Sequence, residues 1–261
     1  MRLDAGCELL FETTEPSPLI LMLRSRPGAA QQIIHDRLQL DPPVPVTDYI
    51  DSYGNYCQRL VAPAGSLRVS SSVTAAVADA IDVQFGAEFV PVQDLPDHAL
   101  QFLLPSRYCQ ADLMAPLAND IVGNIEPAYD QVEAIRHWIH THIEYRYDTS
   151  NASTSAVETE QTRVGVCRDF VHLALALCRS LTIPARMVVG YLYDLKPMDL
   201  HAWFEAFVGG RWYSFDPTQP SPRGNRIVIA YGRDAADVAL ATQFGPLELT
   251  EMQVWVNSAP Q

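Results

Sequence analysis

The spacing of the apolar residues changes part-way along the chain, and this change limits the folds that the chain can adopt. From residue 8 to about residue 89, apolar and polar residues alternate in short runs, most clearly between residues 67 and 75. This period of two predicts antiparallel strands that bury one face. Farther on, at Val132, Ile135 and Ile139, apolar residues recur every three or four positions, which predicts an amphipathic helix. We therefore expect a β-rich first part and a second part that contains helices.

A segment with several prolines separates the two patterns. It carries Pro91, Pro96 and Pro105 and shows little periodicity, as connecting segments do. We therefore predict two domains, an antiparallel β domain over residues 1–105 and a second domain over residues 106–261.

One segment of the second domain is apolar on nearly all sides. It follows Cys167, continues to Leu181 and has Pro184 just beyond its end, which predicts a helix buried in a core. Strands are predicted after this helix, over residues 185–192, 201–208, 211–215, 226–231 and 247–256.

The charge balance excludes two classes of partner. The chain of 261 residues has 18 Lys and Arg against 31 Asp and Glu, a formal charge of -13 at pH 7. This charge would repel a phosphate backbone or an anionic membrane surface. In addition, no stretch approaches the roughly 18 apolar residues that span a bilayer. We predict neither nucleic acid nor a membrane as a partner, and the sequence leaves the oligomeric state open.

The five cysteines are widely spaced, odd in number and form no Cys-x-x-Cys pair. This pattern argues against a disulfide framework or a zinc site. Residues 1–11 contain charges and lack the apolar core of a signal peptide. We therefore expect a reducing, cytoplasmic setting.

Cys167 differs from the other cysteines because it lies at the start of the buried helix. Unpaired backbone N–H groups and the positive end of the helix dipole stabilise a thiolate there, and the same N–H groups can bind an oxyanion. The alternative is that Cys167 is one more small buried residue. Cys178 lies eleven residues later and about 16 Å along the helix axis, and we predict that it packs in the core.

A hairpin downstream brings a histidine and an aspartate together. The strand that begins at His201 is joined to the next strand by a Gly-Gly pair, which can form a two-residue turn. In that register His201 and Asp216 are diagonal neighbours on one face, roughly 7 to 8 Å apart between backbones. Trp203 and Glu205 share this face because the side chains of a strand alternate.

A cysteine, a histidine and an aspartate in this arrangement match the groups used in acyl transfer. Cys167 is the expected nucleophile, and His201 exchanges a proton with it. Asp216 accepts a hydrogen bond from the other ring nitrogen, which fixes the tautomer and supports the imidazolium.

Several short segments around these three residues carry a family pattern: GVCRDF at 165–170, IPAR at 183–186, GY at 190–191, HAW at 201–203 and FDPT at 215–218. In them the chain strongly resembles the transglutaminase-like superfamily of papain-type thiol enzymes. The β region with DSYGN at 51–55 looks like the N-terminal domain of bacterial members, and YGRD at 231–234 is similar to their C-terminal segment.

The resemblance implies an α+β fold. An N-terminal antiparallel β-sandwich-like domain would precede a papain/transglutaminase-like core, in which the cysteine-bearing helix packs on an antiparallel sheet. The family's catalytic triad is carried over onto Cys167, His201 and Asp216. By resemblance, such bacterial proteins are cysteine proteases or amidases, and less often crosslinking enzymes.

The second donor to the oxyanion is open at the level of sequence. Gln161, six residues before Cys167, is a candidate because its amide can donate a hydrogen bond, although a loop glutamine is usually solvated. Tyr145 and Tyr147 are alternatives, since a phenol also donates, and transglutaminases use an upstream tryptophan, for which Trp138 is available.

Trp203 has two possible roles. It could form a wall of the catalytic cleft, or it could be a core aromatic that shields the imidazole from water. Glu205, one step further along the same face, is expected to be an edge charge, and Asp169 is expected to complement the helix dipole.

A metal site is weakly indicated, and a nucleotide cofactor is not indicated. Glu133, His137 and His140 fall on one helix face, with His142 nearby, but no HExxH motif is present. His172 lies about 140 degrees around the helix from Cys167, so it is expected to be a core histidine. No glycine-rich phosphate loop follows a strand. We predict no metal and no cofactor.

The sequence thus predicts a thiol-dependent acyl-transfer enzyme that hydrolyses peptide or amide bonds of a peptide or protein substrate. One alternative is a protein-glutamine transglutaminase that uses an amine acceptor with the same acyl-enzyme. The other is a non-catalytic binding or scaffold protein that keeps the fold.

Overall fold

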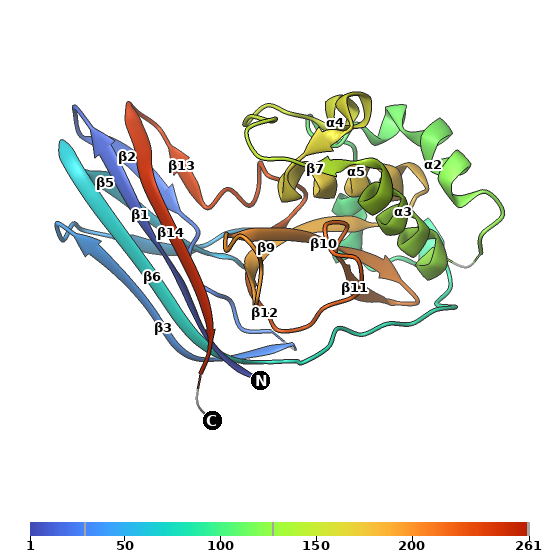
Figure 1. Cartoon of the computed structure of the whole chain (residues 1–261), viewed down its shortest axis with the longest axis horizontal. Coiled ribbons are helices and arrows are strands. Elements are labelled where there is room, and N and C mark those ends of the chain that lie inside the picture. Colours follow the sequence, from blue (N-terminus) through green and yellow to red (C-terminus); the bar gives the residue numbers. More distant parts are fainter. Residues whose placement is uncertain (29, 127, 260–261) are drawn as a thin grey trace.

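The computed structural model describes residues 1–28, 30–126 and 128–259. Strands from both ends of the chain form two sheets on one side of the molecule, and helices cover a third sheet on the other side (Figure 1). The larger sheets are antiparallel, so the predicted α+β class is confirmed.

The first two sheets pack as a sandwich. Their strand orders are β14-β1-β6-β3 and β13-β2-β5-β4. Between them Phe11, Leu19, Leu21 and Leu67 are completely buried, because alternate side chains of each strand face inward. The strands are β1 (Arg2–Thr13), β2 (Ser17–Leu21), β3 (Gln31–Asp41), β4 (Thr47–Ile50), β5 (Tyr56–Ala62), β6 (Gly65–Val77), β13 (Ala241–Gln243) and β14 (Leu247–Ser258).

The last two strands differ from the predicted division of the chain, which assigned all of residues 106–261 to the second domain. β14 pairs with β1 along its length, and β13 pairs with β2. A Cβ at Gly6 would lie 2.3 Å from a ring carbon of Trp255, so the glycine makes room for this pairing. Period-two spacing predicts that residues 247–256 form a strand, but it carries no information about a partner more than 200 residues away.

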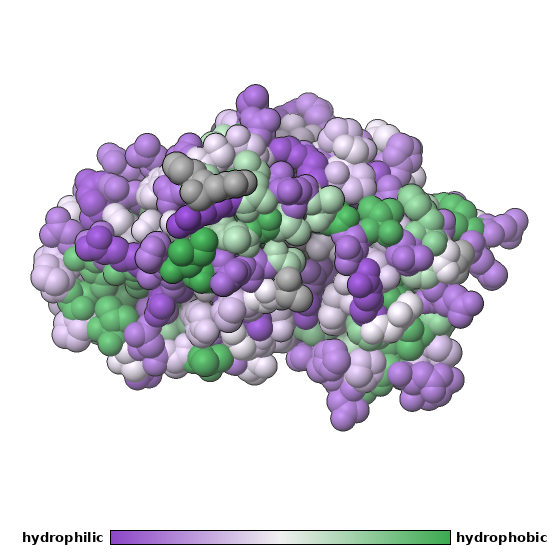
Figure 2. Space-filling view, turned by 90° about the horizontal axis from the view of Figure 1, so that it is seen from below, coloured by the Kyte–Doolittle hydropathy of each residue, from purple (hydrophilic) through white to green (hydrophobic). Residues whose placement is uncertain are grey.

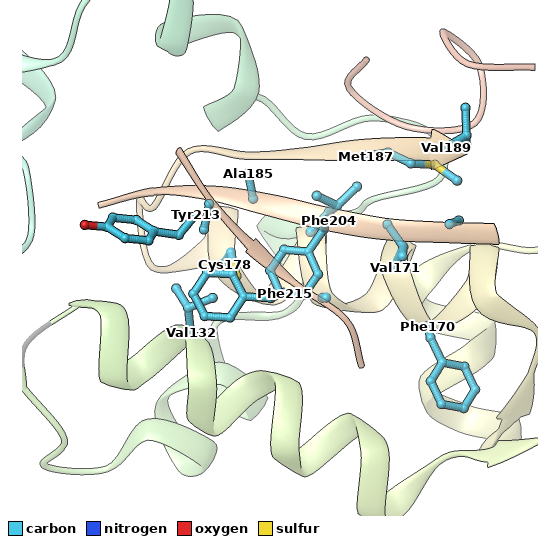
Figure 3. Close-up of a cluster of buried hydrophobic side chains, with 14 of the residues drawn as sticks. Val132, Phe170, Val171, Cys178, Ala185, Met187, Val189, Phe204, Tyr213 and Phe215 are labelled. Carbon is cyan, nitrogen blue, oxygen red and sulfur yellow. The ribbon is translucent and has the colours of Figure 1, made fainter. Parts of the chain in front are cut away.

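The third sheet has the order β11-β10-β9-β12 and carries the hairpin predicted from the sequence. The buried helix α5 (Cys167–Ser180) packs on it. Figure 3 shows Val171 and Cys178 of this helix in one cluster with Phe204 and Phe215 of the sheet. The strands are β9 (Ala185–Leu192), β10 (His201–Val208), β11 (Arg211–Phe215) and β12 (Arg226–Gly232).

Further helices complete this half. In the longest of them Val132, Ile135 and Ile139 are completely buried, as their spacing predicts. None of the helices in the described ranges is long and apolar enough to cross a membrane. The helices are α1 (Asp97–Leu100), α2 (Ala115–Val122), α3 (Ala128–His142) and α4 (Ala156–Thr162), with 3-10 turns at Val92–Asp94, Gln101–Leu103 and Ala111–Leu113. The short strands β7 (Glu144–Tyr145) and β8 (Val164–Gly165) form a parallel pair.

Two side-chain amides join the halves. The Gln31 side chain donates to the Val228 carbonyl at 2.9 Å and accepts from its N–H at 2.6 Å. Asn55 bonds to both backbone groups of Tyr231 in the same way, at 2.9 and 3.1 Å. Because β12 is an edge strand, these amides occupy backbone groups that would otherwise be open to another chain.

The surface mixes polar and apolar residues. On the face seen in Figure 2, hydrophobic residues gather in separate patches between hydrophilic ones. Exposed apolar side chains include Ile50 and Phe85, at 64% and 62% exposure. Such scattered apolar surface is normal for a folded protein.

Candidate active site

Cys167 is the first residue of α5, and the chain around it is shaped to begin a helix there. The Asp169 carboxylate accepts a hydrogen bond from the Val166 N–H at 2.9 Å, which caps the helix. Asp169 was expected to complement the helix dipole, and the hydrogen bond to Val166 was not predicted. A Cβ at Gly165 would lie 2.8 Å from the Asp169 Cβ, so the cap leaves room only for glycine at that position. The sequence around the cysteine therefore fixes where the thiol lies.

His201 and Asp216 are joined by a hydrogen bond. Val208 pairs with Arg211 across the two-residue turn, so the predicted hairpin register is confirmed. That register brings His201 Nε2 to 2.8 Å from Asp216 Oδ2, with both side chains nearly completely buried. Because Nε2 bonds to Asp216, Nδ1 is the nitrogen left for a thiol.

Four donors hold the Asp216 carboxylate. Oδ1 accepts from the Thr218 N–H at 3.1 Å and from the Thr218 hydroxyl at 2.7 Å. Besides His201, Oδ2 accepts from Arg226 Nη2 at 3.3 Å. The following loop is fixed to α3, because Arg136 donates to the Gln219 carbonyl at 2.8 Å. These contacts hold the carboxylate in one orientation toward the imidazole.

The buried pair is ionised at neutral pH. Burial by itself would lower the pKa of His201, but the charge and hydrogen bond of Asp216 and the neighbouring Cys167 thiol raise it to about 9. Burial favours a higher pKa for Asp216, but the opposing effect of His201, Arg226 and Thr218 holds the pKa of this carboxyl below its usual value. An imidazolium therefore lies beside Cys167 at neutral pH.

Cys167 and His201 line one cleft of about 380 Å³. Its other walls come from β9, from the start of β10 and from residues 235–240, which follow β12. Cys167 is partly exposed there, whereas the other four cysteines are buried, and among the described residues all five are free thiols. The cleft thus gives a ligand access to one thiol.

Comparison with known proteins identifies the family. Residues 115–217, which include Cys167, His201 and Asp216, match the model of the transglutaminase-like superfamily. The whole chain superposes on a crystal structure from Cytophaga hutchinsonii, provisionally described as a cysteine protease. The two are 38% identical with a TM-score of 0.94, covering 100% of this chain and 91% of the other. The chain belongs to the transglutaminase-like superfamily.

Two mycobacterial proteins of uncharacterised function are also similar to this superfamily member. Protein ML0607 of Mycobacterium leprae is 29% identical over 234 residues, covering 83% of this chain and 82% of that protein. Protein Rv2569c of Mycobacterium tuberculosis is 29% identical over 244 residues, covering 83% and 77%. Both alignments extend well beyond the region that matches the superfamily model.

Three other candidates from the sequence, Gln161, Trp203 and Glu205, do not line the cleft with Cys167. Gln161 lies in the last turn of α4 with an exposed side chain. Trp203 is 1% exposed, stacks on the His201 ring with centroids 6.3 Å apart and lies below the Arg226 guanidinium. This is the position of a core aromatic that shields the imidazole. Glu205 forms an ion pair with Arg186 at 2.6 Å.

Tyr145 is a close neighbour of Cys167 in this superfamily member. It pairs with Gly165 in the β7–β8 ladder, two residues before Cys167. Burial and the neighbouring Cys167 both raise the pKa of Tyr145, and the Cys167 backbone opposes this effect. Trp138 instead stacks on His142, with ring centroids 4.6 Å apart. The phenol of Tyr145 is thus the sequence alternative that the structure brings to the thiol.

Three residues of the cluster predicted on α3 have partners other than a metal: Glu133, His140 and His142. Glu133 is bound through both carboxylate oxygens by Arg136, at 2.7 to 2.9 Å. The His140 Nδ1 contacts the Pro217 carbonyl at 3.2 Å, and His142 bonds to the Trp138 carbonyl. In the parts of the chain that the structure describes, no three potential metal ligands converge.

Sequence reasoning gave no role to two residues that contact Asp216. Thr218 lies inside the FDPT segment quoted for the family, so its place next to the aspartate was a usable signal. Arg226 begins an otherwise apolar strand and is 7% exposed. A lone cation in such a segment suggests a buried partner, but the sequence does not identify which carboxylate it is.

Proposed function

We propose that this protein is a thiol-dependent acyl-transfer enzyme that hydrolyses peptide or amide bonds. The observation that carries the proposal is the 2.8 Å bond between His201 and Asp216 at the cleft in which Cys167 is the accessible thiol. Membership of the transglutaminase-like superfamily supports this class of chemistry, as does similarity to the Cytophaga hutchinsonii protein.

In the proposed acylation step, the Cys167 thiolate attacks the carbonyl carbon and the carbonyl π electrons move to oxygen. Backbone N–H groups in the first turn of α5 stabilise this oxyanion. The oxyanion then collapses, and the carbon–nitrogen bond breaks as His201 donates its proton to the leaving nitrogen. A free amine leaves, and a thioester remains on Cys167 with neutral His201 beside it.

Water completes the cycle. Neutral His201 takes a proton from a water molecule while the water oxygen attacks the thioester carbon. Collapse of the second oxyanion breaks the carbon–sulfur bond, and the acid product leaves. The thiolate and imidazolium are restored, and Asp216 stabilises the imidazolium through the Nε2 hydrogen bond.

The experiment is hydrolysis of a mixture of fluorogenic peptide amides by purified protein. We expect Cys167→Ala and His201→Ala to abolish hydrolysis. Cys57→Ala is the matched control, because this cysteine is buried in the sandwich, and it should keep full activity. Hydrolysis that persists in Cys167→Ala would contradict the proposal.

The same purified protein also distinguishes the proposed hydrolase from two other functions. In excess primary amine, an isopeptide product seen by mass spectrometry, with no hydrolysis, would indicate a protein-glutamine transglutaminase. A Cys167 thiol inert to iodoacetamide from acidic to basic pH would indicate a non-catalytic scaffold.

The proposed chemistry requires a reduced Cys167. A cytoplasmic location would meet this requirement, because disulfides are rare in that compartment. Fractionation of cells that express the protein tests this location, and recovery of the protein outside the cytoplasm would contradict it.

A further inference from the structure

The cleft at Cys167 has walls that are mainly apolar. Its volume of about 380 Å³ is within the range of roughly 300–1,000 Å³ that ligand pockets occupy. Met187 and Val189 line it from β9, and Val238, Ala239 and Leu240 line it from the segment after β12. A side chain that enters this space therefore exchanges water mainly for hydrocarbon.

The polar groups at the cleft have partners within the protein. Arg168, which follows the nucleophile, donates to Asp169 at 2.9 Å and to the Asn151 carbonyl at 2.8 Å. The Tyr108 hydroxyl donates to the Ala152 carbonyl at 2.8 Å. An amide or carboxylate on an entering side chain would lose its water and find these donors already engaged, which is unfavourable.

One wall of the cleft is held by the sandwich half of the molecule. The Tyr53 hydroxyl donates to the Asp237 carboxylate at 2.7 Å, and the Met22 N–H donates to the Leu240 carbonyl at 2.9 Å. These two bonds hold residues 235–240 at Asp237, in the middle of the stretch, and at Leu240, its last residue. The width of the cleft is therefore set by the structure before a substrate arrives.

We propose that this cleft binds an apolar side chain of the acyl donor, such as that of leucine, next to the carbonyl that Cys167 attacks. The inference rests on the proposed function and adds the class of substrate: peptides with a branched or linear aliphatic residue on the acyl side. Glutamine, which is similar in size but carries an amide, is disfavoured.

The test compares two probes that alkylate Cys167 through the same reactive group. They are the chloromethyl ketones of N-acetyl-leucine and N-acetyl-glutamine, and iodoacetamide is the small reference reagent. Burial of a leucine side chain corresponds to a preference of about 10- to 100-fold. We expect the leucine probe to react with Cys167 faster than the glutamine probe by this factor.

A pair of alanines in one segment provides matched variants. Ala239→Phe fills the cleft, whereas Ala236 is exposed and lies outside the lining, so Ala236→Phe is its control. Ala239→Phe should slow the leucine probe at least about 10-fold more than it slows iodoacetamide. Ala236→Phe should change neither rate.

The outcomes separate the two proposals. One set of outcomes would overturn the apolar cleft and leave the acyl-transfer proposal intact. In it, iodoacetamide labels Cys167, but the two ketones react at equal rates or Ala239→Phe does not change the rate of the leucine probe. Failure of iodoacetamide to label Cys167 would refute the acyl-transfer proposal and this inference with it.

Discussion

Arg226 offers a direct test of how the buried charges act on the imidazole. It is 7% exposed, and its Nη2 lies 3.3 Å from the Asp216 oxygen that also accepts from His201. Among the described residues its Nε and Nη1 atoms have no hydrogen-bond partner. Arg226→Gln removes a buried positive charge beside the imidazolium while keeping a polar side chain at that position.

The size of the effect follows from the distances. Arg226 Nη2 and His201 Nε2 lie 3.3 Å and 2.8 Å from the same Asp216 oxygen, so they are within about 6 Å of each other. At that distance two unit charges repel by about 2.8 kcal/mol with an effective dielectric constant of about 20. Loss of this repulsion raises the pKa of His201 further above its value of about 9. Allowing for solvent and side-chain relaxation, we expect the acid dissociation constant of His201 to fall about 10- to 100-fold.

The assay is the pH dependence of kcat/KM for amide hydrolysis, in which the basic limb reports loss of the His201 proton. Arg226→Gln should shift this limb to higher pH. Arg226→Lys, which keeps the charge, should retain the position of the wild-type limb. Arg223→Gln is the matched control, because that arginine bonds to Gln219 and to the Tyr193 carbonyl. A basic limb in Arg226→Gln that coincides with this control would refute the reasoning.

Three further substitutions have defined outcomes. Gly165→Ala, whose Cβ would lie 2.8 Å from the Asp169 Cβ, should destabilise the protein by about 1–3 kcal/mol in urea unfolding and slow alkylation of Cys167; unchanged stability would contradict the packing argument. Asp216→Asn should lower kcat/KM about 10²- to 10⁴-fold and move the basic limb of the pH profile to lower pH, because the carboxylate raises the pKa of His201. A basic limb that does not move would exclude this effect of Asp216 on His201. Burial lowers the pKa of His172 to about 3 from its usual 6.5, so its neutral form contributes stability that is present above pH 6.5 and is lost as the pH falls toward 3. In this range His172→Phe should reduce the pH slope of the unfolding free energy by up to about 1.4 kcal/mol per pH unit. Equal slopes in the wild-type protein and in His172→Phe would contradict this role of His172.

The parts of the site that could be predicted from sequence are those set by nearby residues. Strand alternation and a two-residue Gly-Gly turn determine which side chains oppose each other, so the approach of His201 to Asp216 followed from counting positions. The position of Cys167 at a helix start likewise follows from its own neighbours, Gly165 and Asp169. In both cases the interactions span only a few residues of chain or one tight turn.

The parts that were missed depend on contacts between distant segments. β14 was predicted as a strand, but its partner β1 lies at the opposite end of the chain. Strand alternation places Trp203 on the same face as His201, but it does not distinguish a cleft wall from a core position. Burial of Trp203 depends on Arg226, which comes from a third strand. Spacing within one segment carries no information about what covers it.

The sandwich contributes to the site through the position of one wall. Residues 235–240 connect β12, in the sheet that carries His201, to β13, which pairs with β2 of the sandwich. The three proposed reacting groups all lie in the other half, so a small rotation between the halves would leave their mutual distances unchanged and would move this wall. The Gln31 and Asn55 amides, which bond to β12, resist that rotation. In the proposed apolar cleft, the contacts between the halves set the width of the substrate site independently of the proposed chemistry at Cys167.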